Sequence, residues 1–91
     1  MTKTAKKRIT FTFSASDAAE VFLVGDFNGW DETAAPMKYK ATGEFEKILQ
    51  LSPGRYEYKF KVDGRWECDP GNWDRCENPH GSMNSVLTVA E

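Results

Sequence analysis

The stretch RYEYKFKVDGRW, from Arg55 to Trp66, carries the strongest signal for the fold of this chain. Aromatic and aliphatic residues alternate there with charged ones, and this period of two predicts a β-strand with one face in the core. The Asp63-Gly64 pair that follows is typical of a two-residue hairpin turn. The stretch therefore predicts a strand over 55–62 that turns back into a short strand near Trp66, with these residues on its apolar face: Tyr56, Tyr58, Phe60 and Val62.

A type I′ turn fixes how the two strands of this hairpin pair. Lys61 then lies opposite Trp66, and paired residues share a face of the sheet. We therefore expect the Trp66 indole on the polar side of the strand, beside Lys61 and diagonal to Lys59. The same register directs Arg65 and Glu67 toward the apolar face, which a short edge strand tolerates. A turn longer than two residues would instead place the indole in the core.

The same alternation recurs along the chain, whereas helix signals are nearly missing. Further strands are predicted over these segments: RITFTFS (8–14), AEVFLVG (19–25), FEKILQL (45–51), SVLTVA (85–90) and a brief one near 37–40. Turn formers separate them, such as Thr42-Gly43 and Ser52-Pro53-Gly54. About seven short strands at such intervals predict an all-β fold, an immunoglobulin-like antiparallel β-sandwich. We expect one domain over residues 1–91.

Length and charge restrict the classes of function. Ninety-one residues can bury a single core but leave little room for an enclosed active site. The net charge of −2, with 29% charged residues, does not favour binding to nucleic acid or to an anionic membrane. The basic run KTAKKR (3–8) is expected to belong to a flexible N-terminal segment over 1–7. Without a long apolar run after Met1, we expect no signal peptide, no membrane span and a cytoplasmic address.

Residues that could support catalysis or bind a metal are scattered. The spacing of Cys68, Cys76 and His80 matches no common zinc pattern and lacks a fourth ligand. In a cytoplasmic protein the two cysteines are expected to be reduced thiols. The acidic residues are spread over turns instead of forming the carboxylate pair of a glycosidase, and there is no nucleophile elbow or phosphate loop. We therefore predict no metal, no cofactor and no enzymatic activity.

Three tryptophans stand among polar residues: Trp30 in DFNGWDE, Trp66 after the hairpin turn, and Trp73 within DPGNWDRCENPHGSMN (69–84). An exposed ring with a polar rim suits a sugar, because the C–H face of the sugar stacks on the ring while its hydroxyls form hydrogen bonds. Single-stranded nucleic acid also stacks on aromatic rings, but it needs a positively charged groove. The segment 69–84 is long for an irregular connector, and it is either a functional loop or a packed surface cover.

Several ordered segments together resemble a known family. VFLVGDFNGWD (21–31), LSPGRYEYKFKVDGRWECDP (51–70) and NSVLTV (84–89) are similar to the glycogen-binding, isoamylase N-terminal type of carbohydrate-binding module, family forty-eight. Such modules occur in the beta subunit of AMP-activated protein kinase and ahead of the catalytic barrel of glycogen branching and debranching enzymes. The likeness runs from about Ile9 to Val89. It implies an immunoglobulin-like β-sandwich that binds α-1,4-glucans such as glycogen, starch and maltooligosaccharides without catalysis.

The resemblance also implies which residues contact the sugar: Trp30, Lys59, Trp66 and Asn84. His80 stands where the kinase-type modules have a leucine that reaches past the sugar, and Ser82 stands where they have a threonine. Trp73 has no counterpart that can be placed, so it is either an added sugar platform or a residue that plugs the loop.

A second function remains open at this stage. Many relatives that are joined to catalytic domains bind sugar weakly or not at all. In this alternative, the chain is an interaction module that docks on a glycan-metabolising enzyme or a kinase, and its sugar site has decayed.

Overall fold

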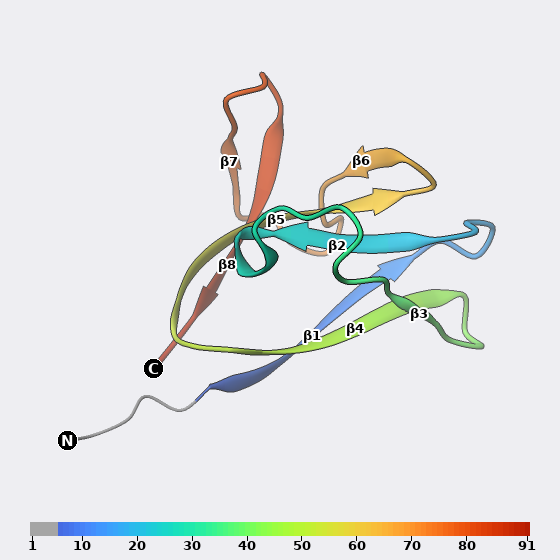
Figure 1. Cartoon of the computed structure of the whole chain (residues 1–91), viewed down its shortest axis with the longest axis horizontal. Coiled ribbons are helices and arrows are strands. Elements are labelled where there is room, and N and C mark those ends of the chain that lie inside the picture. The colour runs from blue at the N-terminus through green and yellow to red at the C-terminus, as the bar shows by residue number, and fades with distance from the viewer. Residues whose placement is uncertain (1–5) are drawn as a thin grey trace.

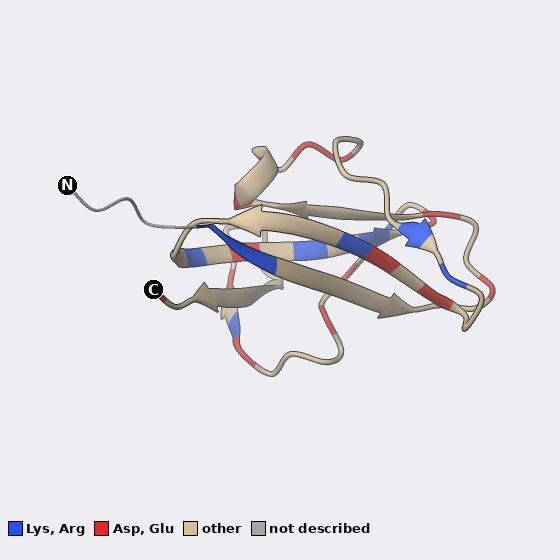
Figure 2. Ribbon diagram, turned by 90° about the horizontal axis from the view of Figure 1, so that it is seen from below, with Lys and Arg blue, Asp and Glu red and all other residues tan. Residues whose placement is uncertain are grey.

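The computed structural model describes residues 6–91, which form two antiparallel β-sheets packed face to face (Figures 1 and 2). The first sheet has the strand order β1-β4-β3, and the second has the order β2-β5-β8-β7 with β6 also paired to β5. The strands are β1 (Lys7–Ser14), β2 (Val21–Gly25), β3 (Lys38–Tyr39), β4 (Glu44–Leu51), β5 (Gly54–Val62), β6 (Arg65–Glu67), β7 (Arg75–Glu77) and β8 (Met83–Val89), and a short 3-10 helix, η1 (Asp26–Asn28), follows β2. The predicted all-β, immunoglobulin-like sandwich is confirmed. In the described part of the chain, no helix has the length and apolar character needed to cross a bilayer.

The core lies between the two sheets and consists largely of residues that alternation assigned to it, together with Ala35 and Met37 from the connection that precedes β3. Phe11 of β1 packs edge-on against Tyr58 of β5 with 5.2 Å between ring centroids, and Phe13 lies 5.0 Å from Phe60. Tyr58 and Phe60 are almost completely buried. Burial of a side chain of the size of Phe60 contributes about 1.5–3 kcal/mol to stability. The apolar faces of β1 and β5 therefore hold the sandwich together, and their opposite faces are free for other roles.

The β5–β6 hairpin has the predicted register, with Trp66 paired to Lys61. The backbone φ angles at Asp63 and Gly64 are 48° and 85°, as a type I′ turn requires. Trp66 is consequently on the outer face of the second sheet and is 42% exposed. Its neighbours in β6, Arg65 and Glu67, point toward the core side of the sheet. They lie at the rim of the sandwich, where Arg65 is exposed. The short strand tolerates this arrangement, as expected.

The structure adds two details to the expected organisation. Residues 6–91 form eight strands, in keeping with about seven predicted, and the additional one, β7, lies inside the segment 69–84 that was expected to be irregular. β7 exists because β8 begins at Met83, extends past its last pairing with β5 and offers its free edge to Arg75–Glu77. At the other end, Lys7 was assigned to a flexible tail but begins β1 opposite Leu51. Residues 1–5 of that proposed tail lie outside the described residues.

One edge of β5 is shared by two strands, and this arrangement positions the candidate site. β2 pairs with residues 58–62 along one edge of β5. On the opposite edge, β8 pairs with residues 54–58 and β6 pairs with residues 60–62. The two partners separate at Lys59, where β8 leaves β5 and rises into the hairpin with β7 (Figure 1). Side chains from the hairpin therefore approach the outer face of β5 beside Lys59.

Candidate functional site

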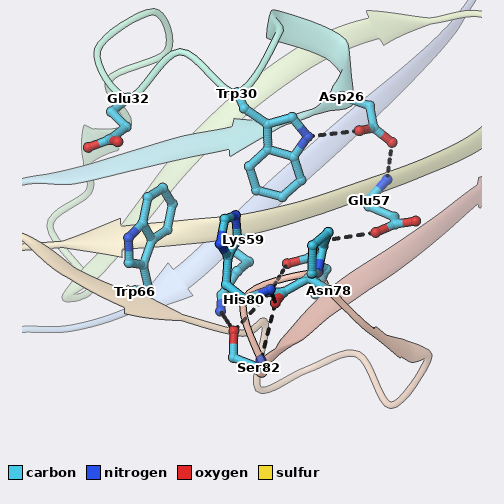
Figure 3. A pocket seen from close by; sticks show the side chains of 11 residues that line it. Asp26, Trp30, Glu32, Glu57, Lys59, Trp66, Asn78, His80 and Ser82 are labelled. Atoms are coloured by element: carbon cyan, nitrogen blue, oxygen red, sulfur yellow. Dashed lines mark hydrogen bonds between the residues drawn. The ribbon is translucent and has the colours of Figure 1, made fainter.

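A hollow of about 610 Å³ lies on the outer face of the second sheet, where the segment after η1, strands β5 and β6 and the β7–β8 hairpin meet (Figure 3). Its lining contains six of the seven residues that the sequence singled out. The exception is Trp73. The lining residues are Asp26, Trp30, Glu32, Glu57, Lys59, Trp66, Asn78, Pro79, His80, Ser82 and Asn84.

Trp66 forms one wall of the hollow. The Lys61 ammonium lies 4.8 Å from the centroid of the indole ring, within the range of a cation–π contact. Lys61 is also ion-paired with Glu32, which belongs to the connection from β2 to β3. This pair lies partly at the surface, where it adds little stability by itself. Its effect is local, because it holds the cation against the ring and so limits the movement of Trp66.

Trp30 forms a second wall, and its indole projects over Lys59 in Figure 3. Its backbone has a φ of 60°, which few residues other than glycine adopt. The indole Nε1–H donates to Asp26 Oδ1 at 2.8 Å, and the backbone N–H donates to the Gly25 carbonyl at 2.9 Å. Gly25 is required here, since a Cβ atom would lie 2.6 Å from the carbonyl oxygen of Glu57. The tight turn after β2 therefore presents a half-buried, hydrogen-bonded ring.

The floor of the hollow is polar although it is buried. Lys59 is 8% exposed and Asn84 is 5% exposed. Lys59 Nζ donates to Ser82 Oγ at 3.3 Å, which is its only hydrogen bond within residues 6–91. An ammonium has three N–H donors, so two of them are available to a ligand. Because Lys59 lines the hollow, these donors favour a ligand rich in hydroxyl groups.

Asn78 organises the turn that carries the rim of the hollow. Its Nδ2 donates to Ser82 Oγ at 2.8 Å and to Asn84 Oδ1 at 3.0 Å. Its Oδ1 accepts the backbone N–H groups of His80 and Ser82 at 2.9 and 3.1 Å. Both donor hydrogens and both lone pairs of the amide are thereby used. The side chain fixes the position of His80 and Ser82, and the turn-forming sequence NPHGS was the available signal for this role.

The acidic residues of the hollow are all engaged by protein donors. Glu57 accepts from Asn84 Nδ2 and from the Arg55 guanidinium, both at 2.9 Å. These hydrogen bonds lower the pKa of Glu57 to about 2, and the bond from Asn84 has the largest effect. The carboxylate is therefore ionised at neutral pH. Asp26 is bonded to the Trp30 indole, and Glu32 is ion-paired. The arrangement offers stacking surfaces and hydrogen-bond donors to a ligand. Our sequence analysis did not identify the roles of Asp26 and Glu57.

Trp73 lies apart from this hollow, in the connection from β6 to β7. It is 88% exposed, and the Arg75 guanidinium carbon lies 5.9 Å from its ring centroid. The Asn72 side chain holds the connection, since it donates to the Val86 carbonyl at 2.8 Å and accepts the Asp74 backbone N–H at 2.9 Å. The alternative in which Trp73 plugs the loop is therefore wrong. The structure also does not bring it together with the other two tryptophans.

The two cysteines are free thiols and are half-buried. Cys68 Sγ lies 3.2 Å from the Met83 carbonyl oxygen, to which it donates. Cys76 belongs to β7 and pairs with Asn84 of β8. Over residues 6–91, the structure contains no cluster of three or more His, Cys, Asp or Glu side chains that could hold a metal ion. The donor set considered from the sequence, with His80 as third ligand, is thus not assembled.

Comparison with known proteins identifies the family. Residues 7–91 match the family model described as the glycogen recognition site of AMP-activated protein kinase. The chain is 49% identical over 55 residues to Protein PTST homolog 2, chloroplastic, of Arabidopsis thaliana, an alignment that covers 60% of this chain and 10% of that protein. It is 40% identical over 86 residues to 5'-AMP-activated protein kinase subunit beta-2 of Homo sapiens, covering 94% and 30% of the two chains.

The chain therefore spans less than a third of the length of these relatives. Among solved structures, a maltogenic amylase from S. marinus superimposes with a TM-score of 0.79 at 21% identity, covering 94% of this chain and 14% of that one. This likeness concerns the fold alone. Because the family model matches nearly the whole chain, the resemblance drawn from the sequence is confirmed: the chain belongs to the family of the glycogen recognition site of AMP-activated protein kinase.

Proposed function

We propose that this chain is a non-catalytic module that binds α-1,4-glucans such as glycogen, starch and maltooligosaccharides. The observation that carries the proposal is the hollow, in which two indole rings stand beside the ammonium of Lys59, which has a single hydrogen-bond partner among the described residues. Glucose units have apolar C–H faces and hydroxyl-rich edges, so they match this combination of rings and donors. Membership of a glycogen-recognition family supports the choice of ligand.

Six of the eleven lining residues have a defined role in this proposal. Glucose rings stack on Trp30 and Trp66, while Lys59 Nζ and the second amide hydrogen of Asn84 donate to hydroxyl oxygens. His80 and Ser82 border the glucan at the rim of the hollow. Since the hollow is open and supplies few hydrogen bonds, the expected dissociation constant is roughly micromolar to millimolar, or about 4–8 kcal/mol.

A titration tests the proposal directly. Maltoheptaose is added to the protein while tryptophan fluorescence is followed, and cellohexaose, with β-1,4 linkages, is the control. We expect a saturable change with the α-glucan alone. The absence of any change up to about 10 mM maltoheptaose, together with unchanged NMR shifts, would contradict the proposal, because a dissociation constant above this range corresponds to less than about 3 kcal/mol.

For Trp73 we propose a separate and weaker sugar contact. Its ring is open to solvent, and its connection is held by hydrogen bonds, which supports a preformed platform. A single ring outside the hollow binds a short oligosaccharide too weakly to matter. On a polymer with many chains, however, a second contact adds to the first through effective concentration.

The second candidate function is docking on an enzyme. One relative is named as a subunit of a protein kinase, and the chain corresponds to only a part of that subunit, which supports association with a catalytic partner. Capture of such a partner that persists in excess maltoheptaose and survives Trp30→Ala and Trp66→Ala would favour docking. Loss of capture in either condition would count against it.

The cellular address remains a prediction. The sequence led us to expect a cytoplasmic protein, whereas one relative carries the word chloroplastic in its name. Fractionation of the source cells, with detection of this chain in each fraction, distinguishes the two compartments.

A further inference from the structure

Two acidic residues at the edge of the hollow, Asp26 and Glu57, hold its walls in place. We propose that Asp26 and Glu57 are positioning residues of the glucan site, which fix Trp30 and Asn84 through carboxylate oxygens that accept hydrogen bonds from the protein. This inference rests on the proposed function of the hollow. The hydrogen bonds involved are drawn in Figure 3.

Asp26 fixes the ring of Trp30. Its Oδ1 accepts the indole Nε1–H at 2.8 Å, and its Oδ2 accepts the backbone N–H of Glu57 at 2.8 Å. The carboxylate therefore ties the ring to strand β5. Trp30 is only half-buried, so core packing by itself does not determine its side-chain orientation. Since the indole N–H is already bonded, the sugar meets the face of the ring and not its polar edge.

Glu57 fixes the amide of Asn84. Its Oε1 accepts from Asn84 Nδ2 at 2.9 Å, while Asn84 Oδ1 accepts from Asn78 Nδ2 at 3.0 Å. A flipped amide would place its carbonyl oxygen against the carboxylate and its NH₂ group against the NH₂ group of Asn78. Both contacts would be repulsive, so only one orientation is stable. The remaining amide hydrogen of Asn84 then has a fixed direction for donation to a hydroxyl.

The two contacts meet in one residue of β5. The backbone N–H of Glu57 holds Asp26, and its carboxylate holds Asn84, so a single strand position links the turn after β2 with the strand β8. Groups that are already oriented before the sugar arrives lose less entropy on binding. Removal of either contact should therefore lower affinity.

Binding of maltoheptaose to Asp26→Ala and Glu57→Ala, measured by calorimetry with thermal denaturation in parallel, tests the proposal. Loss of one oriented hydrogen bond is expected to weaken binding about fivefold in each variant. Glu57→Gln is expected to recover most of the affinity, because its amide oxygen can still accept from Asn84. Arg55→Ala is the matched control: it removes only the partner of the other Glu57 oxygen, and binding should stay within about twofold of wild type.

Side-chain NMR signals of the free protein separate positioning from general damage. The Trp30 indole N–H signal should shift and exchange faster with solvent in Asp26→Ala, whereas the Asn84 NH₂ signals should change in Glu57→Ala. Unchanged signals, or alanine variants that bind like wild type, would overturn the positioning role. If an alanine variant fails to fold, the same signals and the affinities of Asp26→Asn and Glu57→Leu decide, because asparagine keeps only one acceptor oxygen and leucine keeps none. Failure of wild-type protein to bind maltoheptaose, with the free-state signals changing as expected, would refute the proposed function and with it the positioning role for sugar.

Discussion

Trp66 and Trp73 are both exposed, yet their surroundings differ. Trp66 is held by a cation on one side and lines a hollow that also contains Trp30 and the buried Lys59. Trp73 is twice as exposed, and the contact identified for its ring is with the Arg75 guanidinium. Exposure of an aromatic ring is therefore not sufficient for a binding site. Affinity requires that stacking surfaces and hydrogen-bond donors converge on one ligand.

The largest effect is expected for Trp66→Ala. Loss of a stacking ring should weaken maltoheptaose binding at least about tenfold, or about 1.4 kcal/mol. The melting temperature should change little, because the side chain is on the outer face and not in the core. Calorimetric titration and thermal denaturation measure the two quantities. A variant that binds as tightly as wild type would show that the hollow is not the glucan site.

Lys59→Met is expected to have the next largest effect. The methionine keeps the apolar stem but removes the donors, so maltoheptaose binding should weaken about fivefold. Stability should change little, because the Lys59 ammonium forms no ion pair among the described residues. Chemical denaturation together with a binding isotherm checks both statements. Unaltered affinity would mean that the floor of the hollow does not contact the sugar.

Trp73→Ala is expected to weaken binding of polymeric ligands only. Binding to maltoheptaose should be unchanged, since Trp73 lies outside the hollow, while binding to glycogen should weaken about two- to threefold through loss of a second contact. Affinity electrophoresis in gels that contain glycogen measures the second value, and Trp66→Ala serves as the reference for a large loss. An equal loss on the short and the long ligand would place Trp73 in the same site as Trp66.

The smallest effect concerns the pH dependence of stability. The pKa of Glu57 is about 2 in the folded protein and about 4.5 in the unfolded chain. Ionised Glu57 therefore stabilises the fold above pH 4.5. That contribution is lost as the pH falls from 4.5 to 2. Glu57→Gln should therefore show a shallower decline of stability than wild type over this range, as measured by urea denaturation at several pH values. Parallel curves would mean that Asn84 does not stabilise the carboxylate.

Much of the fold follows from signals that are local in the sequence. The alternation over 55–62 and the Asp63-Gly64 pair predicted the hairpin, its register and the outward position of Trp66, because side-chain direction in a strand depends on residue parity and turn type. The family resemblance added Lys59, Asn84, His80 and Ser82 to the predicted site residues. It could not place Trp73, which has no counterpart in the motif.

The remaining features depend on contacts between distant segments. β7 is extended only because β8 presents an unpaired edge, and its three residues carry no pattern of their own. The positions of Asp26 and Glu57 are 31 residues apart in the sequence, so their hydrogen bond arises only when β2 pairs with β5. Asn78 likewise acquires its role from the turn into β8.

Every strand except β7, together with the direction of Trp66, was predictable from residues that are close in the sequence. The tertiary structure was needed to show that Trp73 stands outside the hollow and that Asp26 and Glu57 bond to its walls. Hydrogen bonds between distant segments form only after strand pairing has set their distance, which composition and periodicity do not encode.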